Sequence, residues 1–168
     1  MSNPAAVAKL VVQQAVDCGV ELVASLPDNW MASVIREFDA DERFRHLSVN
    51  REESAVGLCS GAFLSGTGSL AVMGASGLMT LIYAITKINY TYEIPLTILA
   101  TLRGAPGDKA KFHVSNGLYF DDVVKSIDLP CTVIGSREEL PKIAEAYHHA
   151  KKISRPTIAV LPKKVLLG

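Results

Sequence analysis

Short apolar runs alternate with stretches of helical periodicity along this chain, and no other feature restricts the possible folds as strongly. The expected strands cover residues 21–25, 46–49, 69–73, 96–102, 131–134 and 156–161. The expected helices cover residues 4–18, 30–38, 52–64, 78–88, 118–127 and 137–151. These spacings are typical of right-handed crossovers between parallel strands, and runs without polar alternation indicate strands that are covered on both faces. The sequence therefore predicts an α/β fold, a three-layer sandwich with a six-stranded, mostly parallel sheet and helices on both faces.

Length and composition restrict the class of protein further. The 168 residues fit a single domain, 1–168, with a well-buried core. The chain has 17 basic and 17 acidic residues, so it lacks the basic footprint of a nucleic-acid-binding protein. Gly, Ser, Lys or Tyr interrupts each apolar stretch before it reaches membrane-spanning length, and the N-terminus lacks the charged region of a secretory signal. We expect a cytoplasmic protein without a membrane segment.

The cysteine pattern gives no indication of a metal site or a disulfide. Cys18, Cys59 and Cys131 are far apart, and no Cys-x-x-Cys pair occurs. Such spacing favours buried, reduced thiols for all three. No cluster of converging ligands occurs elsewhere, so we expect no metal bound by this chain alone.

Four loops follow the expected strands and should meet at one edge of the sheet, where open α/β proteins bind ligands. They are residues 26–29, the segment around Glu52, residues 74–77 and residues 103–113. Glu52 is the most informative of these positions, because it stands between the carboxyl end of a strand and the first turn of a helix. The start of a helix favours a negative charge.

Each candidate residue also fits a purely structural role. Asp28 is a preferred residue type for a helix N-cap. Glu52 and Glu53 both fit solvated acids in a first helical turn. Arg103 fits an ordinary surface charge, and His113 fits a loop histidine without a role. Local sequence alone leaves these alternatives open.

Five short segments nevertheless occur in a specific order. They are Pro27-Asp28, the stretch from Arg51 to Ala62, the stretch from Met73 to Leu78, Glu93-Ile94-Pro95-Leu96 and Arg103-Gly104. Their order and spacing resemble the pyrimidine-binding (PYR) domain of thiamine-diphosphate-dependent 2-oxo acid decarboxylases. The resemblance is to the alpha subunits of sulfopyruvate decarboxylases and to the N-terminal part of phosphonopyruvate decarboxylases, and it covers residues 6–161.

The resemblance implies roles for two catalytic residues. Gly61-Ala62-Phe63 begins nine positions after Glu52, as the matching segment does after the family's glutamate, which selects Glu52 over Glu53. In the family this carboxylate hydrogen-bonds N1′ of the cofactor's pyrimidine ring and promotes removal of the proton from the thiazolium C2. His113 falls where phosphonopyruvate decarboxylases carry a histidine, so the implied role is proton transfer near the substrate.

The resemblance also implies a set of binding residues. The cofactor-binding residues would be Pro27, Asp28, Glu52, Ser76 and Gly77. Asn29 and Arg103 would contact an anionic substrate, or Arg103 would order its own loop. The third loop departs from the family pattern: relatives usually read Gln-Asn-Ser-Gly-Leu-Gly-Asn, whereas this chain reads Gly-Ala-Ser-Gly-Leu-Met-Thr over residues 74–80.

A second part of the family's site is missing from this sequence. The family binds the cofactor's diphosphate through Mg²⁺ in a PP domain with a Gly-Asp-Gly…Asn motif, but the only Gly-Asp here is Gly107-Asp108. The resemblance implies that a separate PP-domain beta subunit holds the Mg²⁺, in a hetero-oligomer such as α2β2 or larger.

The sequence thus supports two hypotheses. The first is the alpha subunit of a two-subunit, thiamine-diphosphate-dependent decarboxylase of an anionic 2-oxo acid such as sulfopyruvate or phosphonopyruvate. The alternative is a non-catalytic regulatory or binding domain that retains the PYR fold. Glu52 favours the first hypothesis, and the missing amides of the third loop favour the second.

Overall fold

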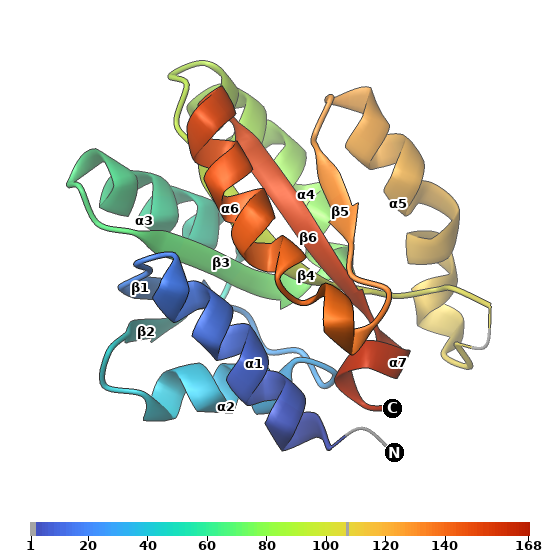
Figure 1. The fold of residues 1–168 in the computed structure, drawn as a ribbon. Coiled ribbons are helices and arrows are strands. Elements are labelled where there is room, and N and C mark those ends of the chain that lie inside the picture. Colours follow the sequence, from blue (N-terminus) through green and yellow to red (C-terminus); the bar gives the residue numbers. More distant parts are fainter. Residues whose placement is uncertain (1–2, 107) are drawn as a thin grey trace.

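Six parallel strands form the central sheet of the computed structural model, which describes residues 3–106 and 108–168 (Figure 1). The strands are β1 (Leu22–Ser25), β2 (Arg45–Ser48), β3 (Ser69–Gly74), β4 (Leu96–Leu102), β5 (Cys131–Val133) and β6 (Pro156–Pro162). Their order in the sheet is β2-β1-β3-β4-β6-β5, and every pairing is parallel. The predicted α/β sheet is confirmed, and it is wholly rather than mostly parallel.

Helices cover both faces of this sheet, which confirms the three-layer prediction (Figure 1). One face packs against α1 (Pro4–Asp17), α2 (Ala32–Ala40), α6 (Lys142–Ile153) and the short α7 (Lys163–Leu166). The other face packs against α3 (Glu52–Leu64), α4 (Leu78–Ala84) and α5 (Val114–Ser126). Within the described part of the chain, no helix combines the length and the apolar character needed to cross a membrane.

The strands supply side chains to two separate cores. In β3, Leu70 and Val72 point into the core under α1, α2 and α6, whereas Ala71 and Met73 point into the core under α3, α4 and α5. Each fully buried aliphatic side chain of this size stabilises the fold by about 1.5–3 kcal/mol. Because both faces of β3, β4 and β6 are buried, these strands are mostly apolar along their length, which explains their nearly continuous apolar runs.

Several element boundaries differ from the prediction. Trp30 lies in a turn before α2 rather than in the helix, because the Asp28 carboxylate accepts hydrogen bonds from the backbone N–H groups of Trp30 and Met31 and closes that turn. Helix α5 begins at Val114 instead of residue 118, since Val114 and Leu118 are both exposed and mask the helical period. Helix α4 ends at Ala84 and continues as the π-helix η2 (Ile85–Tyr90).

The prediction of three buried thiols is wrong for two of them. All three cysteines are free, but only Cys59 is buried, and burial raises the pKa of its thiol to about 11. Cys18 is partly exposed, and Cys131 is exposed because β5 is the edge strand of the sheet. Gly107, which the sequence places in the fourth loop, lies outside the described residues.

Gly104 should tolerate no side chain. Its φ is +77°, and a Cβ there would overlap the carbonyl oxygen of His113 and the backbone of Gly117 at the start of α5. Gly66 has a similar φ of +81°, but a Cβ there would meet no atom. We expect Gly66→Ala to cost about 1–2 kcal/mol from backbone strain alone and Gly104→Ala to cost about 3 kcal/mol or more. Urea unfolding of the two variants would measure this difference, and equal costs would contradict the close approach of the two backbones.

Candidate active site

The carboxyl ends of β1, β2, β3 and β4 bring the four predicted loops to one edge of the sheet. The chain order reverses between β1 and β3, because β2 lies on one side of β1 and β3 lies on the other. In open α/β sheets, ligands bind in the crevice at such a reversal. The loops that carry Asp28, Glu52 and Gly77 all surround this point.

Glu52 is the first residue of α3, and its side chain lies against Gly77 of the third loop. A Cβ at Gly77 would overlap Cγ, Cδ and Oε1 of Glu52, so Glu52 could keep this position only while residue 77 is glycine. The neighbouring Glu53 instead pairs with Arg51 at 3.5 Å. Within residues 3–106 and 108–168, the half-buried Glu52 carboxylate has neither a hydrogen-bond donor nor an ion-pair partner. It is therefore available to a ligand.

Asp28 forms a buried ion pair with Arg103 that joins the first loop to the end of β4. The pair is 2.5 Å long, and its side chains are only 5% and 7% exposed. The Oδ1 atom of Asp28 caps the turn at Trp30 and Met31, while Oδ2 also accepts a hydrogen bond from Thr101. Asp28 thus closes the turn before α2, whereas the N-cap of the helix itself is Met31 without a side-chain hydrogen bond, so the helix N-cap interpretation of Asp28 is wrong. The interpretation of Arg103 as an ordinary surface charge is also wrong.

The buried His113 extends this network, because Arg103 Nη1 contacts its Nε2 atom. A guanidinium group only donates, so Nε2 accepts, and Nδ1 carries the ring hydrogen that it donates to Asp108 Oδ2 at 2.7 Å. The pKa of Asp108 is lowered from its usual value, mainly by the hydrogen bond that its carboxylate accepts from the Gly104 N–H. The contact with His113 lowers this pKa further. Both ring nitrogens of His113 are thus engaged in this arrangement.

The third loop, residues 74–77, contacts both α5 and the Asp28 carboxylate. Ser76 is exposed, and its hydroxyl accepts a hydrogen bond of 2.9 Å from the amide of Asn116, a buried residue of α5. A Cβ at Gly74 would lie 2.6 Å from Asp28 Oδ2, so Gly74 leaves room for the Asp28 carboxylate. Pro27 and Asn29 are exposed.

Sequence reasoning missed four polar or aromatic residues of this site: Trp30, Thr101, Asp108 and Asn116. Trp30 lies under the Arg103 guanidinium, with 4.4 Å between Cζ and the ring centroid. Asp108 and Asn116 lie in a segment without periodicity, and the only available signal was their closeness in sequence to His113. Among the residues that the structure describes, no group of three or more His, Cys, Asp or Glu side chains could hold a metal ion.

Known proteins place this chain in a family. It is 30% identical over 120 residues to sulfopyruvate decarboxylase subunit alpha from Methanococcus maripaludis, and the match covers 71% of this chain and 72% of that subunit. The chain belongs to the sulfopyruvate decarboxylase alpha-subunit family. The family prediction made from the five sequence segments is therefore confirmed.

Two further relatives of this alpha-subunit family member are longer than the chain. Sulfopyruvate decarboxylase from Methanosarcina acetivorans is 32% identical over 147 residues, and phosphonopyruvate decarboxylase from Streptomyces viridochromogenes is 28% identical over 142 residues. The chain spans 38% and 34% of their lengths. A 2-oxoglutarate:ferredoxin oxidoreductase from Magnetococcus marinus shares the fold, with a TM-score of 0.69 and 12% identity over 94% of this chain and 28% of that one. No family model matches the sequence.

The buried ion pair makes a testable contribution to stability. Asp28→Asn would leave the Arg103 charge buried without its partner, which should cost about 3–5 kcal/mol. Asp41→Asn is the matched control, because its partner Arg43 is 57% exposed and the pair should contribute far less. Chemical unfolding of both variants would compare them, and similar losses would show that the Asp28–Arg103 pair does not stabilise the edge of the sheet.

Proposed function

We propose that this alpha subunit is the pyrimidine-binding half of a thiamine-diphosphate-dependent decarboxylase that acts on an anionic 2-oxo acid such as sulfopyruvate or phosphonopyruvate. The observation that carries the proposal is the Glu52 carboxylate, which has no partner among the described residues and lies on Gly77 beside the reversal of strand order. The names of the relatives support a decarboxylase.

The residues around Glu52 fit a flat aromatic cofactor. Gly74, Ala75 and Gly77 present almost no side-chain volume next to the carboxylate, and a Cβ at either glycine would collide with Asp28 or Glu52. Thiamine diphosphate, when bound, would supply the electron sink for loss of carbon dioxide. Glu52 would hold a proton at the pyrimidine N1′, and Asp28, Ser76, Gly77 and Pro27 would position the ring.

Arg103 and His113 would act on the substrate side of the same edge. The guanidinium has five N–H donors. Single contacts to Thr101, His113 and Asp28 leave some of these donors for the second anionic group of the substrate, together with Asn29. For His113 to transfer a proton, its contact with Arg103 would first have to open. Substrate binding to Arg103 would favour that opening.

A partner subunit would complete the site. The longer relatives extend far beyond the region that matches this chain, whereas three relatives are named as separate alpha subunits. We infer that a beta subunit with a PP domain supplies the Mg²⁺ and diphosphate sites, in a hetero-oligomer such as α2β2. Helices α4 and α5 expose Met79, Tyr83, Leu118 and Tyr119, which suits a surface that a partner covers.

Glu52→Gln tests the function directly. The amide keeps the shape but cannot exchange the proton, so turnover of the assembled complex should fall about 10²–10⁴-fold. Glu53→Gln should leave turnover nearly unchanged, because Glu53 points away around the helix start and pairs with Arg51. Steady-state decarboxylation of sulfopyruvate and phosphonopyruvate would give the comparison, with circular dichroism as the control for folding. Small, equal effects of both substitutions would overturn the assignment of Glu52.

A further inference from the structure

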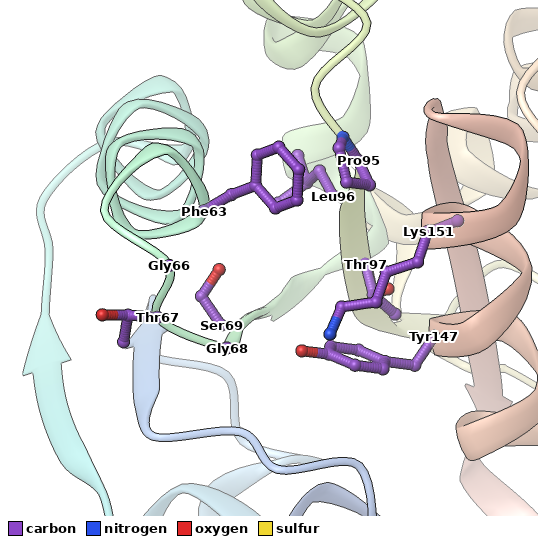
Figure 2. A pocket seen from close by; sticks show the side chains of 11 residues that line it. Phe63, Gly66, Thr67, Gly68, Ser69, Pro95, Leu96, Thr97, Tyr147 and Lys151 are labelled. Carbon is purple, nitrogen blue, oxygen red and sulfur yellow. The ribbon is translucent and has the colours of Figure 1, made fainter.

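A small cavity lies at the amino edge of the sheet, at the opposite end of the strands from Glu52 (Figure 2). Its volume is 120 Å³, and it opens between the turn after α3, the start of β4 and helix α6. The side chains that matter here are those of Phe63, Leu96, Thr97, Tyr147 and Lys151. None of them belongs to the site at the carboxyl edge.

One wall of this cavity is polar. Tyr147 and Thr97 are only 4% and 2% exposed, yet both line the cavity. Figure 2 shows the Lys151 ammonium and the Tyr147 hydroxyl directed toward the turn at Gly68, and the ammonium lies 4.9 Å from the centre of the Tyr147 ring. Among the described residues, no protein group accepts a hydrogen bond from the hydroxyl of Tyr147 or from the hydroxyl of Thr97. Each of these two hydroxyls therefore has a hydrogen to donate into the cavity.

The Tyr147 hydroxyl remains a donor at neutral pH. Burial is the main cause that raises its pKa, nearby Cys18, Cys59 and Glu21 raise it further, and the backbone N–H of Ser69 lowers it through a hydrogen bond. Glu21 is exposed and lines the neighbouring groove beside β2 rather than this cavity. Lys151 lines the cavity and Glu21 does not, so the charged group on the polar wall is a cation.

The opposite wall is apolar. It consists of Phe63 at the end of α3 together with Pro95 and Leu96 at the start of β4. An apolar cavity of about 150 Å³ can bind benzene, so 120 Å³ gives room for a molecule of a few non-hydrogen atoms. A ligand that satisfies both walls needs an anionic end and a short hydrocarbon end.

We propose that this cavity binds a short-chain monocarboxylate. The carboxylate would accept hydrogen bonds from the Lys151 ammonium and from the hydroxyls of Tyr147 and Thr97, and the hydrocarbon end would pack on Phe63 and Leu96. Charge-assisted bonds of this kind are the stronger class of protein hydrogen bonds. The site is independent of Glu52 and of the proposed decarboxylase function.

Binding can be measured with propionate as the probe and with two comparison molecules. Propionamide has the same shape without the charge, and inorganic phosphate has charge without the hydrocarbon end. At constant ionic strength, propionate should give a saturable rise in the melting temperature of the full chain and one site by calorimetry. Propionamide should give no rise, and phosphate should bind more weakly than propionate.

Two variants locate the site. Lys151→Met keeps the aliphatic stem and should weaken propionate binding about tenfold or more, whereas Lys152→Met, at a neighbouring exposed position of α6, should leave it unchanged. Tyr147→Phe should weaken binding while keeping the ring. An absence of saturable binding, an equal response to propionamide or unaltered binding by Lys151→Met would overturn the proposal. Tighter binding of phosphate than of propionate would overturn the choice of a carboxylate.

Discussion

The ion pair between Asp28 and Arg103 holds together the carboxyl edge on which the proposed chemistry depends. One oxygen of Asp28 shapes the turn into α2, while the other pairs with a guanidinium that also contacts His113. Two charges so deeply buried stabilise the fold only when each hydrogen-bonding group has a partner. Thr101 donates to Asp28 and accepts from Arg103, and Asp108 accepts from His113, so these residues supply further partners to the network. The network therefore fixes the first and fourth loops as one unit.

The glycines of the third loop are the second constraint. Gly74 gives room to the Asp28 carboxylate, and Gly77 gives room to Glu52. A side chain at residue 74 would displace the Asp28 carboxylate, and one at residue 77 would displace the Glu52 carboxylate. The space without side chains next to these carboxylates would then be filled. This explains physically why the loop is rich in small residues without the sequence pattern of a phosphate-binding loop.

The sequence predicted the sheet, its helices and the place of Glu52 at a helix start well, because apolar periodicity and an acid at a helix start are local signals. The catalytic role of Glu52 stays a prediction. The range of α3, Glu52–Leu64, agreed with the prediction at both ends. The contacts of Arg103 were not predictable, since Asp28 lies 75 positions away and the pairing depends on strand order. The contact between Asn116 and Ser76 spans 40 positions and follows from packing alone.

We propose that this chain holds one half of a cofactor site and that a partner holds the other. Calorimetric titration of thiamine diphosphate with Mg²⁺ tests it most directly, first into the chain alone and then into its mixture with a co-expressed PP-domain subunit. We expect weak binding to the chain alone and tight, Mg²⁺-dependent binding to the mixture. Tight, Mg²⁺-dependent binding to the chain alone would contradict it.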